Sequence, residues 1–169
     1  MIEIDITEKQ VERAEKLYDF KNLKNSITEG KSNIYGAMGE IIVFDYFCDK
    51  CKILHESTFD YDMIIDDIKV DVKSKKVTSY PKENYVCSVA AANISQLCDY
   101  YLFTRIMKDF SKGFILGYLK KDEFYKIAFF GKKGELDETD QYRKWTFSAD
   151  CYNVKISELK KIAGELKCQ

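Results

Sequence analysis

Apolar residues recur at helical spacing in several segments of the chain. Thr7 and Gln10 have the spacing of a helix capping box, and we expect a helix over residues 8–23. A second helix is predicted over residues 33–47, and a closing helix from about Ser157 onward. A shorter helical segment over 121–130 is followed by Gly131, a residue typical of the position just after a helix.

Between these helices, short apolar runs bounded by turn residues predict strands. The segments are 3–6 at a sheet edge, then 60–65, 68–74, 85–91, 100–107, 114–119 and 141–154, with a short helix over 94–99. This succession predicts an α/β fold with a mixed sheet. No repeat, linker or change of composition divides the chain, so we expect one domain over residues 1–169.

The segment from residue 60 to residue 73 has the pattern of a β-hairpin. If Asp66 and Asp67 form its two-residue turn, two residues face each other across the hairpin when their residue numbers add up to 133. One face is then apolar, with Met63 opposite Val70. A slip of one residue would mix the apolar and polar faces, so the alternation supports this register independently.

The polar face of this hairpin gathers charge. Asp62 is expected opposite Asp71, and Asp60 opposite Lys73. Two facing carboxylates repel each other unless a divalent cation lies between them, and Mg²⁺ prefers such oxygen ligands. Because Lys73 follows Asp71 by two residues, its ammonium lies on the same face. The grouping suits metal-assisted hydrolysis of a phosphodiester, although a solvated polar face with an ordinary ion pair explains the hairpin equally well.

A further carboxylate lies in the second predicted helix. Glu40 has largely apolar neighbours at helical spacing, and burying an unpaired carboxylate is costly. Gly36 and Gly39 are unfavourable inside a helix, which indicates close packing of its backbone. A helix laid on the hairpin could bring Glu40 to the acidic pair; the alternative is an ordinary salt bridge.

These residues together resemble the PD-(D/E)XK, or restriction-endonuclease-like, nuclease superfamily. Gly39-Glu40 matches the helix of the motif, Asp62 its first acid and Asp71-Val72-Lys73 its D-x-K element. The predicted order helix, three strands, helix, strand over residues 33–107 also matches the αβββαβ core, with an N-terminal helix and C-terminal additions outside it. Tyr61 replaces the proline of the motif, and Asp60 competes as the first acid.

The resemblance implies a site and an activity. It implies Mg²⁺ or Mn²⁺ bound by Asp62, Asp71 and the carbonyl of Val72, with Glu40 as an outer or second-metal ligand. Lys73 would orient the attacking water. A later helix of the family often adds a polar residue to the site, and Gln96 stands in the corresponding place.

The net charge and the distribution of charged residues along the sequence point in different directions on nucleic-acid binding. The 169 residues carry a net charge of −1, which argues against a globally cationic nucleic-acid binder. Yet residues 56–67 hold five acids and no base, whereas residues 69–82 hold five lysines and one aspartate. We expect the cationic stretch to bind phosphates beside the metal site, through Ser74, Lys75, Lys76 and Lys82, with Gln96 as a further contact.

The remaining composition narrows the chemistry. A single histidine, His55, excludes histidine triads and multi-histidine metal sites. Cys48 and Cys51 have the spacing of half a zinc or iron–sulfur site, but the other four cysteines are scattered, so small apolar residues are the better interpretation. The absence of a membrane-spanning apolar run and the charged N-terminus predict a cytoplasmic protein.

The sequence therefore predicts a Mg²⁺- or Mn²⁺-dependent nuclease that acts on DNA, and more specifically an endonuclease. RNA as the substrate and a homodimeric assembly stay open. Two alternatives are a catalytically inactive nucleic-acid-binding or interaction module on the same fold, and a structural interaction protein whose charges form ordinary surface pairs.

Overall fold

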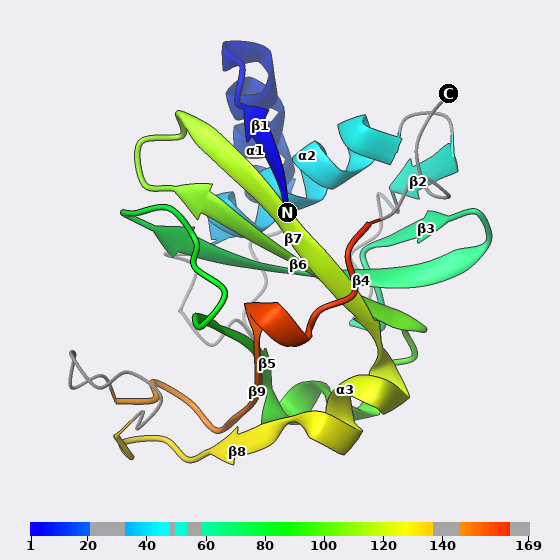
Figure 1. The fold of residues 1–169 in the computed structure, drawn as a ribbon. Helices are drawn as coiled ribbons and strands as arrows, with labels where there is room; N and C mark the ends of the chain where they lie inside the picture. The colour runs from blue at the N-terminus through cyan, green and yellow to red at the C-terminus, as the bar shows by residue number, and fades with distance from the viewer. Residues whose placement is uncertain (21–32, 48–49, 54–58, 137–145, 163–169) are drawn as a thin grey trace.

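A six-stranded mixed sheet forms the centre of the protein. The computed structural model describes the chain apart from residues 21–32, 48–49, 54–58, 137–145 and 163–169 (Figure 1). The strand order is β1-β7-β6-β4-β3-β2, and only β4 and β6 run parallel. The strands are β1 (Ile2–Asp5), β2 (Cys51–Ile53), β3 (Met63–Ile65), β4 (Ile68–Val77), β6 (Tyr100–Met107) and β7 (Lys112–Lys120).

Two helices, α1 (Glu8–Phe20) and α2 (Asn33–Phe47), cover one face of this sheet (Figure 1). Their apolar side chains share a core with Val70 and Val72 of β4. At Gly39 the backbone of α2 comes so close to the sheet that a Cβ atom would lie 1.7 Å from Ser74 Oγ. The glycine that the sequence places inside this helix is therefore needed for contact with the sheet.

A smaller three-stranded sheet and a short helix lie on the opposite face (Figure 1). The sheet has the order β5-β9-β8, and an aromatic core that includes Tyr101 and Phe103 of β6 joins it to the large sheet. The elements are β5 (Val86–Ala90), the 3₁₀ helix η2 (Ala91–Ser95), α3 (Lys121–Ile127), β8 (Phe129–Gly131), β9 (Cys151–Lys155) and the 3₁₀ helix η3 (Ile156–Glu158).

The predicted hairpin is confirmed in its turn and register. Met63 pairs with Val70 and Ile65 with Ile68. Asp66 and Asp67 both have left-handed backbone angles, with φ of 46° and 65°. Two left-handed central residues are typical of a type I′ turn, which matches the twist of the flanking strands.

Other elements differ from the prediction. The mixed α/β class, the helix at 33–47 and the strand at 100–107 are confirmed, and the edge strand at 3–6 is found at Ile2–Asp5. The strand expected over 60–65 begins only at Met63, and β5 pairs with β9 instead of joining the large sheet. The helix expected over 94–99 is wrong for residues 96–99, because the structure has only the 3₁₀ helix η2 at Ala91–Ser95 in this region.

The C-terminal elements differ more. The helix expected over 121–130 ends at Ile127, because residues 129–131 pair with β9 as β8. The closing helix expected from Ser157 is wrong for residues 157–162. The structure describes only the short 3₁₀ helix η3 (Ile156–Glu158) in this stretch. Parts of the predicted segments 8–23, 141–154 and the closing helix lie outside the described residues. Within the described part of the chain, no helix has the length and apolar character needed to cross a membrane.

Candidate functional site

Alternation along β4 separates its charged residues from the helical layer. Val70, Val72 and Ser74 face α2, the two valines through the shared core and Ser74 through its contact with Gly39. Asp71 and Lys73 therefore lie on the opposite face, where their parallel neighbours Tyr101 and Phe103 belong to the second core. The carboxylate and the ammonium are thus held between the two sheets.

Asp71 is the centre of a buried polar cluster. Asp71 is only 3% exposed. Its Oδ1 accepts a hydrogen bond of 2.8 Å from Gln96 Nε2, and its Oδ2 lies 2.5 Å from Lys73 Nζ. The short distance to Lys73 is that of an ion pair, but among the described residues Oδ2 has no partner with hydrogen-bond geometry. This carboxylate oxygen is therefore held by the ammonium of Lys73.

Asp62 approaches Asp71 from the start of the hairpin. Because the ladder ends at Met63, Asp62 is not paired in register with Asp71 as expected. Its main-chain N–H instead donates to Val70 O, and its Oδ2 accepts a 2.8 Å hydrogen bond from the N–H of Val72. The two carboxylates are close enough that Asp62 raises the pKa of Asp71, so the predicted proximity is present without the predicted pairing.

Burial and charge set the protonation of this cluster. Burial raises the pKa of Asp71 to about 6; Lys73 opposes that rise, and Asp62 adds to it. Burial alone would lower the pKa of Lys73, but the two carboxylates outweigh it and hold that pKa above its ordinary value. Lys73 is therefore a cation at neutral pH and cannot accept a proton there.

The raised pKa of Asp71 predicts how stability depends on pH. Between its ordinary value of 3.8 and about 6, the folded protein keeps a proton that the unfolded chain releases. The contribution of the Asp71 carboxyl group to the free energy of unfolding is complete below about pH 4. It is lost as the pH rises through about 6. We expect the unfolding free energy of the wild type, minus that of Asp71→Asn, to fall by roughly 2–3 kcal/mol from about pH 4 to 7.

Urea denaturation of both proteins at each pH, in the presence of EDTA, measures this difference. Taking the difference removes the contributions of titrating groups that are not coupled to Asp71, such as Glu123, whose pKa is lowered by Lys160. A difference that increased with pH would mean that the folded protein stabilises the carboxylate of Asp71, contrary to the burial described above.

Gln96 connects three segments at this site. Gln96 is only 3% exposed. Its Nε2 donates a hydrogen bond to Asp71 Oδ1 and a second one, of 2.6 Å, to the carbonyl of Phe59. The sequence places Gln96 among the nucleic-acid contacts, whereas its amide nitrogen is engaged inside the protein. Asp60, expected opposite Lys73, accepts a hydrogen bond from Leu97 N instead.

Glu40 and Ser74 belong to the other face of the sheet. Glu40 is 7% exposed and lies on α2, next to Gly39. Ser74 Oγ lies 2.6 Å from Thr104 Oγ1, between the helix and the sheet. The helix that carries Glu40 thus approaches the hairpin from the side opposite to Asp71, and the Ser74 hydroxyl is engaged in helix–sheet packing.

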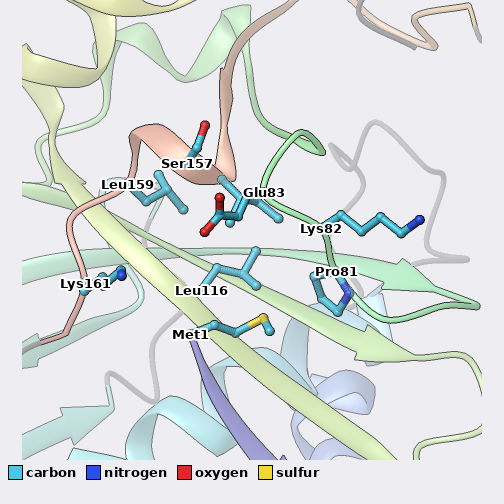
Figure 2. A pocket seen from close by; sticks show the side chains of 9 residues that line it. Met1, Pro81, Lys82, Glu83, Leu116, Ser157, Leu159 and Lys161 are labelled. Carbon is cyan, nitrogen blue, oxygen red and sulfur yellow. The ribbon is translucent and has the colours of Figure 1, made fainter. Parts of the chain in front are cut away.

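The lysines expected to bind nucleic acid point in different directions. Lys75 and Lys76 are exposed neighbours on β4, so they project from opposite faces; Lys76 Nζ lies 5.4 Å from the ring centre of Tyr35 on α2. Lys82 lines a separate pocket, together with residues that include Leu116 (Figure 2). Only Lys75 shares the face of Asp71 and Lys73.

The donor set is compatible with a hard cation. Asp62 and Asp71 supply carboxylate oxygens, and Asp71 Oδ2 is buried beside the ammonium of Lys73. No group of three or more His, Cys, Asp or Glu residues able to hold a metal occurs in the described part of the chain. Two carboxylates with a backbone carbonyl nevertheless suit Mg²⁺, which usually keeps several waters.

The predicted cysteine pair cannot be compared as a pair, because Cys48 lies outside the described residues. Cys51 is buried with its Sγ 3.5 Å from Met63 Sδ, and burial raises the pKa of its thiol to about 12. Cys51 therefore packs as a small apolar residue in the core.

Sequence reasoning missed the residues that hold the Gln96 segment. Lys121 Nζ donates to the carbonyl of Gln96, and Tyr101 Oη donates to the carbonyl of Asn93 at 3.3 Å. The 3₁₀ segment is thereby fixed by groups from α3 and β6. In the sequence Lys121 belongs to a short basic run typical of a solvent-facing surface, and no local pattern marks its contact with a residue 25 positions earlier.

No protein-family model matches this chain, and no curated protein is significantly similar to it. The cluster around Asp71 is therefore interpreted from its own chemistry.

Proposed function

We propose that the protein is a metal-dependent nuclease that hydrolyses phosphodiester bonds in DNA, and that it acts as an endonuclease. The observation that carries the proposal is the cluster of Asp62, Asp71 and Lys73, in which a buried carboxylate oxygen lies beside one ammonium and a second carboxylate. A fixed ion pair would need only one acid. The second acid, Asp62, favours a site for a further cation.

The residues that would hold Mg²⁺ or Mn²⁺ are Asp62 and Asp71, with the carbonyl of Val72. When bound, such an ion polarises a phosphoryl oxygen and lowers the pKa of a water molecule. Gln96 keeps the carboxylate of Asp71 in one orientation through its 2.8 Å hydrogen bond. Glu40 is not part of the proposed metal site, because α2 lies on the other face of the sheet.

Lys73 supplies positive charge that is fixed before the substrate arrives. The pKa of its ammonium is held above the ordinary value, so Lys73 acts as a cation and hydrogen-bond donor. Developing negative charge on a phosphate is stabilised most by donors that need no reorientation, as in other preorganised sites. Lys75, exposed on the same face, is placed to contact a neighbouring phosphate.

The test is incubation of the purified protein with supercoiled plasmid, a single-stranded oligonucleotide and an RNA of the same sequence. Each substrate is combined with Mg²⁺, Mn²⁺ or EDTA. We expect cleavage of DNA with either metal and none with EDTA, and internal cuts that convert the plasmid to nicked or linear forms.

Salt-dependent binding without cleavage by any metal would contradict the proposal and favour an inactive nucleic-acid-binding module. Neither binding nor cleavage would favour an interaction protein with surface ion pairs. Cleavage of RNA alone would keep the site chemistry and overturn the choice of substrate.

A further inference from the structure

We infer that Lys121, the first residue of α3, is a positioning residue that holds Gln96 against Asp71 and thereby orders the cluster. Its side chain donates a hydrogen bond to the main-chain carbonyl of Gln96, while the side chain of Gln96 donates to Asp71. The contact joins the helix of the second layer to the hairpin of the large sheet. As far as it concerns catalysis, the inference rests on the nuclease activity proposed above.

Gln96 depends on its backbone being held in place. Its side-chain nitrogen spans two acceptors, Phe59 O and Asp71 Oδ1, and its buried Oε1 has no hydrogen-bond partner among the described residues. Both side-chain hydrogen bonds of Gln96 therefore depend on the position of its nitrogen, which is set by the main chain. On the main-chain side, the N–H of Gln96 donates to Asn93 O at 3.0 Å, within the same 3₁₀ segment.

The contacts that tie this segment to the rest of the protein come from three directions. Lys121 holds the carbonyl of Gln96 from α3, and Tyr101 holds the carbonyl of Asn93 from β6. Asp99 exchanges hydrogen bonds with Lys69 of β4, and its carbonyl accepts one from the N–H of Lys121. Lys121 thus bonds to both ends of residues 96–99. Its ammonium donates to the carbonyl of Gln96, and its main-chain N–H donates to the carbonyl of Asp99.

The charge of Lys121 makes its contact stronger than a neutral hydrogen bond. A hydrogen bond from a charged group is roughly twice as strong as one between neutral groups. No described carboxylate forms an ion pair with Lys121, so its described side-chain hydrogen bond is the one to the Gln96 carbonyl. The ammonium also lies near enough to Cys98 to affect that thiol electrostatically, as does Lys73 from the cluster itself.

The experiment compares Lys121→Met, Lys121→Arg and Lys126→Met with the wild type. Lys126 is exposed on the same helix and controls for the loss of a lysine from α3. Amide hydrogen exchange is followed by NMR at Gln96 and Leu97, and cleavage of single-stranded DNA with Mn²⁺ gives kcat and KM.

For Lys121→Met we expect exchange at Gln96 and Leu97 to rise by about tenfold or more, and exchange in β1 to stay unchanged. We expect kcat to fall by about tenfold with KM within about twofold, since groups that orient a metal ligand typically contribute 10–100-fold. Lys121→Arg should restore most of both, and Lys126→Met should match the wild type.

Unchanged exchange at Gln96 in Lys121→Met would overturn the inference. A uniform rise in exchange that includes β1 would also overturn it, because it would reveal a general loss of stability. If the wild type cleaves no nucleic acid, the proposed function fails, while the exchange measurement still decides whether Lys121 holds Gln96.

Discussion

Replacing Asp71 by Asn should lower the rate of DNA cleavage by roughly a thousandfold or more. Asparagine has nearly the same shape as aspartate but no negative charge. It therefore removes the carboxylate that lies 2.5 Å from Lys73 Nζ and that would bind the cation, while leaving the volume of the buried site almost unchanged. Single-turnover cleavage of a labelled oligonucleotide with Mg²⁺ and with Mn²⁺ measures the loss.

Asp67→Asn is the matched control on the same hairpin. Asp67 is exposed in the turn with a φ of 65°, a conformation that asparagine adopts readily, so this variant should cleave at close to the wild-type rate. Near-ultraviolet circular dichroism and thermal unfolding establish that both variants are folded. A folded Asp71→Asn protein with wild-type activity would refute the metal site assigned to this carboxylate.

Gly39→Ala should destabilise the protein by about 2 kcal/mol, although alanine is the better helix former. The added Cβ would lie 1.7 Å from Ser74 Oγ and 2.6 Å from Thr104 Oγ1, so the helix or the hydroxyl pair has to move. Overpacking of this kind costs about 1–3 kcal/mol or more, whereas the gain in helix propensity is about 1 kcal/mol. The steric cost therefore exceeds the gain.

Gly36→Ala is the natural comparison, because nothing lies within 4 Å of a Cβ built at Gly36. This substitution should stabilise the protein by about 0.5–1 kcal/mol. Urea denaturation of both variants gives the two free energies of unfolding. Equal effects of the two substitutions would mean that α2 does not pack on β4 at Gly39.

The hairpin can be predicted from sequence because its information is local. Alternation fixes which side chains share a face, and a two-residue turn fixes the register, so the pattern alone places Asp71 and Lys73 together. The position of Asp62 is harder to predict, because the ladder stops one residue short of it. Its carboxylate bonds to the N–H of Val72 in place of a regular strand pairing.

The errors occur where distant segments compete for the same backbone groups. Residues from Ser157 onward have a helical apolar pattern, but the main chain of Lys160 exchanges two hydrogen bonds with Tyr118 of β7. These non-local hydrogen bonds replace the helix. The same reason explains why Gln96 and Lys121 are not predicted as partners: their contact depends on how α3 packs, which no short pattern encodes.

The parallel pairing of β4 with β6 has a consequence for the order in which the site forms. The hairpin closes through contacts between near neighbours, whereas Val70 meets Tyr100 only after a connection of about thirty residues has been ordered. We expect Asp71 to stay hydrated in early folding intermediates and to lose its water only when β6 and the Gln96 segment dock. If the cluster binds metal as proposed, ions present during refolding would reach its carboxylates before β6 closes over them.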